Sequence, residues 1–229
     1  MVTLTGEMLS CMYARKMDAS QHYLEAKRAA DIFSGNTVRA LIGSNVFMRV
    51  GELINGNELP ESTDFDFLSD NVDVKVPDGW TLFRNRAGYA KLVHGDVPCD
   101  TPPAKLKEMF CVDVTRMVDI YQLRERPVAP TLENFLCGNM TNAQSMLYLP
   151  DQRLVMGPLG IEAMRQRRVR VLDRQNLDNH VGARIAQYNS VANYLRRKAQ
   201  QLSSGDVCFT AETTDDMEQQ HAETLINAP

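Results

Sequence analysis

The chain has 229 residues and a formal net charge of −4, with 44% hydrophobic and 24% charged residues. These values fit one globular α/β domain with a helical extension; they exclude a uniformly basic nucleic-acid binder, and no apolar run is long enough to span a membrane. The N-terminus lacks a signal peptide, and five scattered cysteines without a CxxC pair exclude a disulfide framework and indicate a reducing cytoplasm.

The first part of the chain predicts helices and short strands. Asp18 followed by Gln21 is typical of a helix start, and Gly35 is a typical helix stop. Residues 46–53 predict a second, shorter helix. Five segments have the short apolar or alternating pattern of strands: residues 38–42, 63–68, 80–84, 89–94 and 110–115.

The second part of the chain divides by charge. Nine basic and two acidic residues lie between Arg165 and Lys198, whereas the last 24 residues, from Asp206, include six acidic and no basic ones. Residues 157–160 predict a turn, and apolar residues spaced three or four apart from Ile185 to Leu202 predict one amphipathic helix. We therefore expect three regions: a domain over residues 1–160, a basic helical segment over 161–203, and a disordered acidic tail over 204–229.

Asp64 and Asp66 are the strongest candidates for chemistry. Residues i and i+2 of a strand point to the same face, so both carboxylates project together while Phe65 and Phe67 face the core. Two neighbouring carboxylates repel each other, and a divalent cation removes that repulsion. Since Mg²⁺ prefers carboxylates combined with phosphate oxygens and water, we predict that Asp64 and Asp66 bind two Mg²⁺ ions and catalyse phosphoryl-type transfer.

Gly43 and Ser44 lie between the strand at residues 38–42 and the helix that follows it. A glycine lets the backbone approach a phosphate closely, and the start of a helix supplies N–H groups to which the Ser44 hydroxyl adds a donor. We predict that Gly43 and Ser44 bind the phosphates of a nucleotide. The alternative is that Ser44 is only a turn residue.

A third acid is expected on a neighbouring strand, and Asp113 fits best. A charge inside an apolar strand is costly unless it is paired or bound to a metal. Asp113 would act as a general base or as a third metal ligand. The alternatives are that Asp113 pairs with Arg116, or that Asp96 or Asp100 supplies the third acid.

Three arginines, Arg167, Arg168 and Arg170, are candidates for contact with RNA, although such a cluster also occurs on solvated surfaces with salt bridges. Lys91 and Arg86 are weaker candidates for binding a triphosphate. The four histidines lack the spacing of metal ligands, so we expect no zinc site.

The Gly43-Ser44 pair, the Asp64-Phe65-Asp66 strand and the later Asp113 strand together resemble the DNA polymerase β-type nucleotidyltransferase superfamily. Later segments resemble the head domain of bacterial poly(A) polymerases and CCA-adding tRNA nucleotidyltransferases, and the chain from Arg184-Ile185 onward resembles their first neck helix. The head-like segments are Cys137 to Tyr148, Arg153 to Glu162 and Arg167 to Leu172.

The resemblance implies an α+β fold, in which a head with a small mixed sheet and flanking helices is followed by a short helical neck. It also implies an Mg²⁺-dependent enzyme that transfers a nucleotide from an NTP, ATP or CTP, to an RNA (tRNA) 3′ end and releases pyrophosphate.

The sequence also departs from the family pattern. The stretch from Asn139 to Gln144 matches loosely, and no Glu-Asp-x-x-Arg template for base selection lies near Asp178 to Arg184. There is also no room for the family's tRNA-gripping body and tail domains. These departures keep two alternatives open: a small-molecule or protein acceptor, and a catalytically inert relative that binds nucleotide or RNA. Oligomeric state is not indicated.

Overall fold

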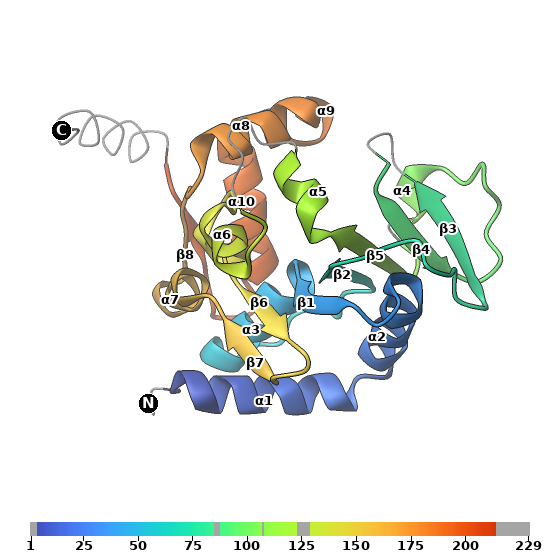
Figure 1. The fold of residues 1–229 in the computed structure, drawn as a ribbon. Helices are drawn as coiled ribbons and strands as arrows, with labels where there is room; N and C mark the ends of the chain where they lie inside the picture. The colour runs from blue at the N-terminus through green and yellow to red at the C-terminus, as the bar shows by residue number, and fades with distance from the viewer. Residues whose placement is uncertain (1–3, 85–87, 107, 123–128, 214–229) are drawn as a thin grey trace.

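A mixed sheet of seven strands crosses the middle of the molecule in the order β3-β4-β5-β2-β1-β6-β7 (Figure 1). The computed structural model describes residues 4–84, 88–106, 108–122 and 129–213. β2 and β5 are parallel, and every other neighbouring pair is antiparallel. The strands are β1 (Val38–Ile42), β2 (Asp64–Ser69), β3 (Trp80–Arg84), β4 (Ala90–His94), β5 (Cys111–Arg116), β6 (Leu147–Leu149) and β7 (Leu154–Met156). The first five confirm the strands expected from the sequence.

One face of the sheet is covered by α2 (Gln21–Ser34), which buries Tyr23 and Phe33 together with Phe65 and Val112 of the sheet. α1 (Gly6–Ala19) runs along the lower edge of the molecule (Figure 1). The expected helix start at Asp18 is wrong. α1 continues to Ala19, and the cap of α2 is Ser20, whose Oγ accepts from the backbone N–H of Tyr23 at 3.2 Å.

The opposite face of the sheet is covered unevenly. α6 (Leu132–Cys137) contributes Phe135 and Leu136 to a cluster that also contains Ala40, Leu68 and Leu147. Leu68 is near the carboxyl end of β2, and Asp64 and Asp66 are at the start of the same strand face. This apolar cluster therefore covers the strand face at its Leu68 end and does not cover Asp64 and Asp66.

Most of the remaining helices lie on the β6 side of the sheet or above β5, and α4 lies beside β3 and β4 (Figure 1). They are α3 (Ser44–Asn55), α4 (Pro103–Leu106), α5 (Met117–Gln122), α7 (Pro158–Gln166), α8 (Arg174–Ala183), α9 (Ile185–Tyr188) and α10 (Val191–Leu202). A 3₁₀ turn covers Asn142–Gln144. The expected turn at residues 157–160 is instead the start of α7, because Pro158 occupies its first turn, where a missing N–H costs nothing.

The amphipathic helix expected from Ile185 to Leu202 is interrupted. Asn189 has a positive φ of 62°, and Ser190 then caps α10 by accepting from the backbone N–H of Asn193 at 3.2 Å. The apolar spacing continues through the break, although α9 buries none of its residues and the buried apolar side chains, Tyr194, Leu195, Ala199 and Leu202, all belong to α10. Spacing alone therefore did not reveal the turn.

The beginning of the expected acidic tail is ordered. β9 (Thr210–Ala211) pairs in parallel with β8 (Arg168–Val169), and the Glu212 carboxylate accepts from the backbone N–H of Val171 at 2.7 Å. Residues 214–229, the rest of that tail, lie outside the described residues. Within the part of the chain that is described, no helix is long and apolar enough to cross a membrane. The division at residue 160 stays a proposal, since one hydrophobic cluster includes Val46, Met164 and Leu195.

Candidate active site

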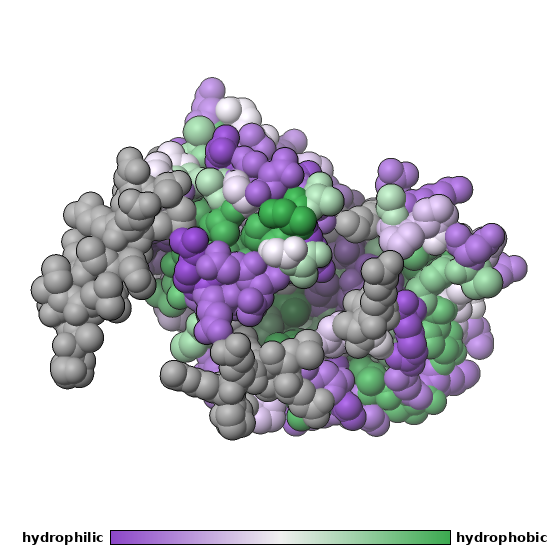
Figure 2. Space-filling view, turned by 90° about the horizontal axis from the view of Figure 1, so that it is seen from above, coloured by the Kyte–Doolittle hydropathy of each residue, from purple (hydrophilic) through white to green (hydrophobic). Residues whose placement is uncertain are grey.

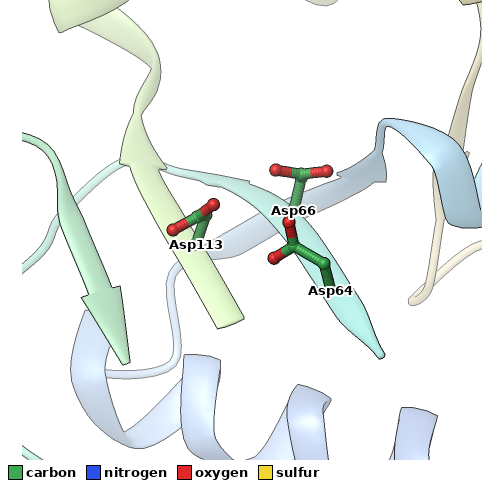
Figure 3. Close-up of side chains that lie close together, drawn as sticks. All are labelled: Asp64, Asp66 and Asp113. Carbon is green, nitrogen blue, oxygen red and sulfur yellow. The ribbon is translucent and has the colours of Figure 1, made fainter. Parts of the chain in front are cut away.

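Asp64, Asp66 and Asp113 project from the same face of the adjacent strands β2 and β5 (Figure 3). The parallel register sets Asp66 directly beside Asp113, and one carboxylate oxygen from each of the three residues lies within 4.8 Å of the others. Asp96 and Asp100 are exposed in the loop after β4. The third acid of the cluster is therefore Asp113, and Arg116 pairs with Asp119 at 2.7 Å.

The alternation of the two strands explains why these acids gather. Phe65 and Phe67 of β2 and Val112 and Val114 of β5 are buried in the main hydrophobic cluster on the α2 side. The intervening residues must face the other way, because successive strand side chains alternate between faces. Burial of the apolar residues thus holds the carboxylates on the opposite face.

The backbone at Gly43 lies very close to the carboxylate of Asp66. The φ of 75° and ψ of −154° of Gly43 belong to a region that is essentially restricted to glycine. A Cβ at this position would lie 2.1 Å from Oδ2 of Asp66. The backbone at the start of α3 therefore contacts the Asp66 carboxylate directly, and no other amino acid leaves room for it.

The start of α3 is tied to the start of β2. The Asn45 side-chain amide donates to the backbone carbonyl of Asp64 at 2.7 Å. The hydroxyls of Ser44 and Ser62 lie 3.3 Å apart. The Ser62 hydroxyl also donates to the Asp64 carbonyl, at 3.2 Å. Ser44 consequently has a structural partner as well as a position at a helix N-terminus.

A buried ion network holds the loop between α3 and β2. Arg49 donates to the carbonyls of Leu59 and Pro60 at 3.2 and 2.9 Å and pairs with Glu52. Glu52 accepts from the backbone N–H of Leu59 at 2.8 Å and pairs with Lys16 at 2.6 Å. These bonds order the long connection that separates Gly43-Ser44 from the Asp64 strand.

Lys91 is the cation of the carboxylate cluster. Its strand, β4, pairs Lys91 with Asp113, and its Nζ lies 2.7 Å from Asp113 Oδ2 and 3.0 Å from Asp64 Oδ1. The sequence indicated Lys91 only as a weaker candidate for binding a triphosphate, although a lysine inside the apolar strand Ala90–His94 needs an acidic partner. The other triphosphate candidate, Arg86, lies outside the described residues.

The negative charge of the cluster exceeds the positive charge that contacts it. Burial, followed by repulsion from Asp64 and Asp113, raises the pKa of Asp66. Burial also raises the pKa of Asp113 to about 6, although the ammonium of Lys91 acts in the opposite direction. Carboxylates that are both crowded and destabilised in their ionised form are a suitable ligand set for a divalent cation.

Lys198 brings α10 to the same site. Its ammonium lies 5.2 Å from the ring centroid of Phe47, in α3, and 5.6 Å from that of Tyr194. Burial lowers the pKa of Lys198 to about 8, while the nearby Asp66 acts to raise it. Seen from above, the surface is hollowed between the side formed by α8 and α9 and the side formed by β3 and β4 (Figure 2).

The three arginines proposed to contact RNA lie around β8, away from the carboxylates. Arg167 has a positive φ of 52°, and its Nε donates to the Asn55 side chain at 2.8 Å. Asn142 joins this region to the 3₁₀ turn: its amide donates to the Arg168 carbonyl at 3.1 Å, and its side-chain oxygen accepts from the Arg170 N–H at 2.7 Å. The loosely matching stretch from Asn139 to Gln144 therefore has a structural role.

Comparison with known proteins gives matches among solved structures. No family model and no curated protein sequence matches the chain. A CCA-adding enzyme in complex with CTP superposes with a TM-score of 0.53 at 14% identity, over 99% of this chain and 48% of that enzyme. The Thermotoga maritima CCA-adding enzyme complexed with tRNA gives 0.52 at 13% identity, over 93% of this chain and 44% of that enzyme.

These likenesses establish the fold. The chain shares the fold of these CCA-adding enzymes, which confirms the α+β class and the fold that the resemblance of its motifs implied. The chain spans less than half the length of these two enzymes.

Proposed function

We propose that this chain is an Mg²⁺-dependent nucleotidyltransferase, which transfers NMP from an NTP to a hydroxyl acceptor and releases pyrophosphate. The observation that carries the proposal is the parallel register of β2 and β5, which sets Asp113 beside Asp66 and gathers three carboxylates on one strand face. The contact between Gly43 and Asp66 supports it, because the backbone at the start of α3 borders the same carboxylates.

In this proposal Asp64 and Asp66 hold two Mg²⁺ ions. The metal ions supply electrostatic stabilisation of the charge that develops on the phosphoryl group and the departing pyrophosphate. Asp113 assists these two acids, either as a third metal ligand or as the base that accepts the proton of the attacking hydroxyl, and its raised pKa of about 6 makes it a stronger base than an ordinary aspartate. The rest of the catalysis is positioning of donor and acceptor.

The nucleotide, ATP or CTP, is proposed to lie against the start of α3. Gly43 and Ser44 would contact its phosphates through the helix N-terminus. Lys198 is a further candidate for this contact, supported by its position over the Phe47 ring and by its electrostatic interaction with Asp66.

The acceptor is proposed to be an RNA 3′ end, with tRNA as the first candidate. Beside Lys198, the rings of His180, Tyr188 and Tyr194 contact one another, and the Arg197 guanidinium lies 5.5 Å from the Tyr188 ring centroid. Aromatic rings combined with cations are typical of surfaces that bind single-stranded nucleic acid. Arg167, Arg168 and Arg170 remain proposed as a second RNA contact.

The test is transfer of label from each of the four NTPs, with Mg²⁺, to total tRNA, to a generic RNA oligomer and to no RNA. The wild type is compared with an Asp64→Asn/Asp66→Asn double variant and with an Asp96→Asn/Asp100→Asn control, which removes two exposed acids instead. We expect the first variant to lose transfer by about 1000-fold or more and the control to retain it.

Each outcome identifies an acceptor class or removes the proposal. Label in RNA, lost only in the Asp64→Asn/Asp66→Asn variant, supports RNA as acceptor, and the preferred NTP defines the activity. Label that enters a small molecule or a protein of a cell extract, with the same variant dependence, keeps the chemistry and changes the acceptor. If no label is transferred either to RNA or in cell extract, the catalytic proposal is wrong. The chain is then better explained as a nucleotide- or RNA-binding relative.

A further inference from the structure

Lys91 contacts the two acids at one side of the carboxylate cluster. Its Nζ lies 2.7 Å from Asp113 and 3.0 Å from Asp64, and the Cys111 sulfur is 3.4 Å away. The lysine side chain is 22% exposed, so this ammonium is partly shielded from water. The distances are those of direct, charge-assisted hydrogen bonds to both carboxylates.

The cluster therefore already contains a cation at the oxygens that a metal ion would use. Asp64 Oδ1 and Asp113 Oδ2 each accept a hydrogen bond from the ammonium. A divalent ion bound to the same oxygens would lie within a few ångströms of the ammonium, and two cations at that separation repel each other strongly in a partly buried site. Metal binding at Asp64 and Asp113 then requires the ammonium to leave.

We propose that Lys91 is a built-in counter-cation of this site, which competes with a divalent ion for Asp64 and Asp113 and, once displaced, binds the polyphosphate of the nucleotide. The inference rests on the proposed function and specifies how its site is loaded. A long, flexible lysine side chain anchored in β4 can exchange a carboxylate for a phosphate without a change in the backbone.

Coupled binding of metal and polyphosphate follows from this competition. Without polyphosphate, metal binding breaks the two ion pairs of Lys91 and leaves the ammonium without an anionic partner. With polyphosphate present, the displaced ammonium regains an anionic partner, so the metal binds more tightly. By thermodynamic linkage, the metal must strengthen polyphosphate binding by the same factor.

The experiment titrates Mn²⁺, as a spectroscopic probe, into the full chain with and without pyrophosphate and reads bound Mn²⁺ by electron paramagnetic resonance. Wild type is compared with Lys91→Met, and with Lys105→Met, which removes an exposed lysine of α4 and the same formal charge. We expect Lys91→Met to bind Mn²⁺ alone about tenfold more tightly than wild type, and pyrophosphate to strengthen Mn²⁺ binding in wild type and Lys105→Met only.

Equal Mn²⁺ affinity in wild type and folded Lys91→Met would overturn the inference while leaving the proposed function standing, provided that the Asp64→Asn/Asp66→Asn variant loses the bound ion. Failure of all three chains to bind Mn²⁺ would remove both. Nucleotide transfer, measured separately, distinguishes a wrong role for Lys91 from a wrong function.

A measurement on the wild type keeps the inference testable if Lys91→Met does not fold. Lysines are labelled with an amine-specific reagent at increasing Mn²⁺ concentration, and the labelled sites are read by mass spectrometry. Displacement predicts that Mn²⁺ increases labelling of Lys91 several-fold and leaves Lys105 unchanged. Unchanged labelling of Lys91 at saturating Mn²⁺ contradicts the inference.

Discussion

Two clusters of charged residues, one centred on Glu52 of α3 and one on the acids of β2 and β5, differ in how completely their charges are paired. In the first, Glu52 accepts from Arg49, Lys16 and the backbone of Leu59. In the second, Asp64, Asp66 and Asp113 lie together, and the ammonium of Lys91 contacts Asp64 and Asp113. Among the described residues, two cations form ion pairs with the one acid of the first cluster, whereas one cation, Lys91, forms ion pairs with two of the three acids of the second.

The pKa values show what this difference means. Burial alone would raise the pKa of Glu52, yet hydrogen bonds from Arg49 and Lys16 lower it, so its charged form is stable in the fold. The pKa values of Asp66 and Asp113 are raised, so the fold disfavours their charged forms. A cluster whose charges are paired stabilises the folded structure. A cluster whose carboxylates are not fully paired can instead gain free energy by binding a cationic ligand.

The strongest test of this difference between the two clusters is to disturb the geometry of the carboxylate cluster without changing its charge. Gly43→Ala would force a methyl group onto Asp66 Oδ2, at 2.1 Å, and displace that carboxylate. We expect nucleotide transfer to fall by about 100-fold, the scale of a 1 Å misplacement in an active site. The measurement is the rate of pyrophosphate release under saturating Mg²⁺.

Gly56→Ala is the matched control. Gly56 also has a positive φ, 69°, but nothing lies within 4 Å of the position of an added Cβ. The Gly56→Ala substitution should lower the free energy of unfolding by about 1 kcal/mol, as alanine does in the left-handed region, and leave the rate of pyrophosphate release unchanged. Equal losses of rate in the two variants would mean that helix α3, rather than the Asp66 contact, determines activity.

The Glu52 cluster should behave in the opposite way. Glu52→Gln removes the charge that Arg49 and Lys16 share, so we expect a loss of about 3 kcal/mol in the free energy of unfolding, as for a broken buried ion pair. Urea denaturation measures the loss. The folded fraction should keep transfer within a few-fold of wild type, because Glu52 does not contact the carboxylate cluster.

Glu58→Gln, an exposed change six residues away, is the control for Glu52→Gln and should change stability by less than about 0.5 kcal/mol. If Glu52→Gln were as stable as this control, the Arg49–Glu52–Lys16 network would not be what orders the loop.

The acids of the site could be predicted from the sequence because their signal is local. The alternation of Asp64-Phe65-Asp66-Phe67 determines which side chains share a face, and Asp113 stands out as a charge between buried valines. The strands β1 to β5 were predictable for the same reason, whereas the three-residue strands β6 and β7 were not predicted. The need for glycine at position 43 was predicted only in part. The sequence predicted that the backbone there lies close to another group, but the expected group was a phosphate and not the Asp66 carboxylate.

The contacts of the cations with the acids could not be predicted, because the positions of the cations depend on long-range packing. Lys91 reaches Asp113 only through the register of β4 with β5, and Lys198 reaches the vicinity of Asp66 only because α10 packs against α3. The break at Asn189 was hidden by continuous apolar spacing. The basic cluster at Arg167 was visible, but its hydrogen bond to Asn55 was not.

The smallest expected effect concerns the pH dependence of the carboxylate cluster. In metal-free protein Asp113 has a pKa of about 6, above the ordinary value of 3.8 that applies to the unfolded chain. Between these two values the folded state binds more protons, so the free energy of unfolding decreases as pH rises and the loss is complete above about pH 6. Relative to Asp113→Asn, which cannot titrate there, wild type should lose about 1–2 kcal/mol between about pH 4 and pH 7.

Urea denaturation of both chains in the presence of a chelator, at intervals across that range, measures this difference. Saturating Mg²⁺ should then restore wild-type stability above about pH 6 and have a smaller effect on Asp113→Asn, because the ion binds the ionised carboxylates that the metal-free fold disfavours. A pH-independent difference between the two chains would show that Asp113 is already satisfied by Lys91. The carboxylate cluster would then resemble the Glu52 network, and the case for a cation-binding site would depend on Asp64 and Asp66 alone.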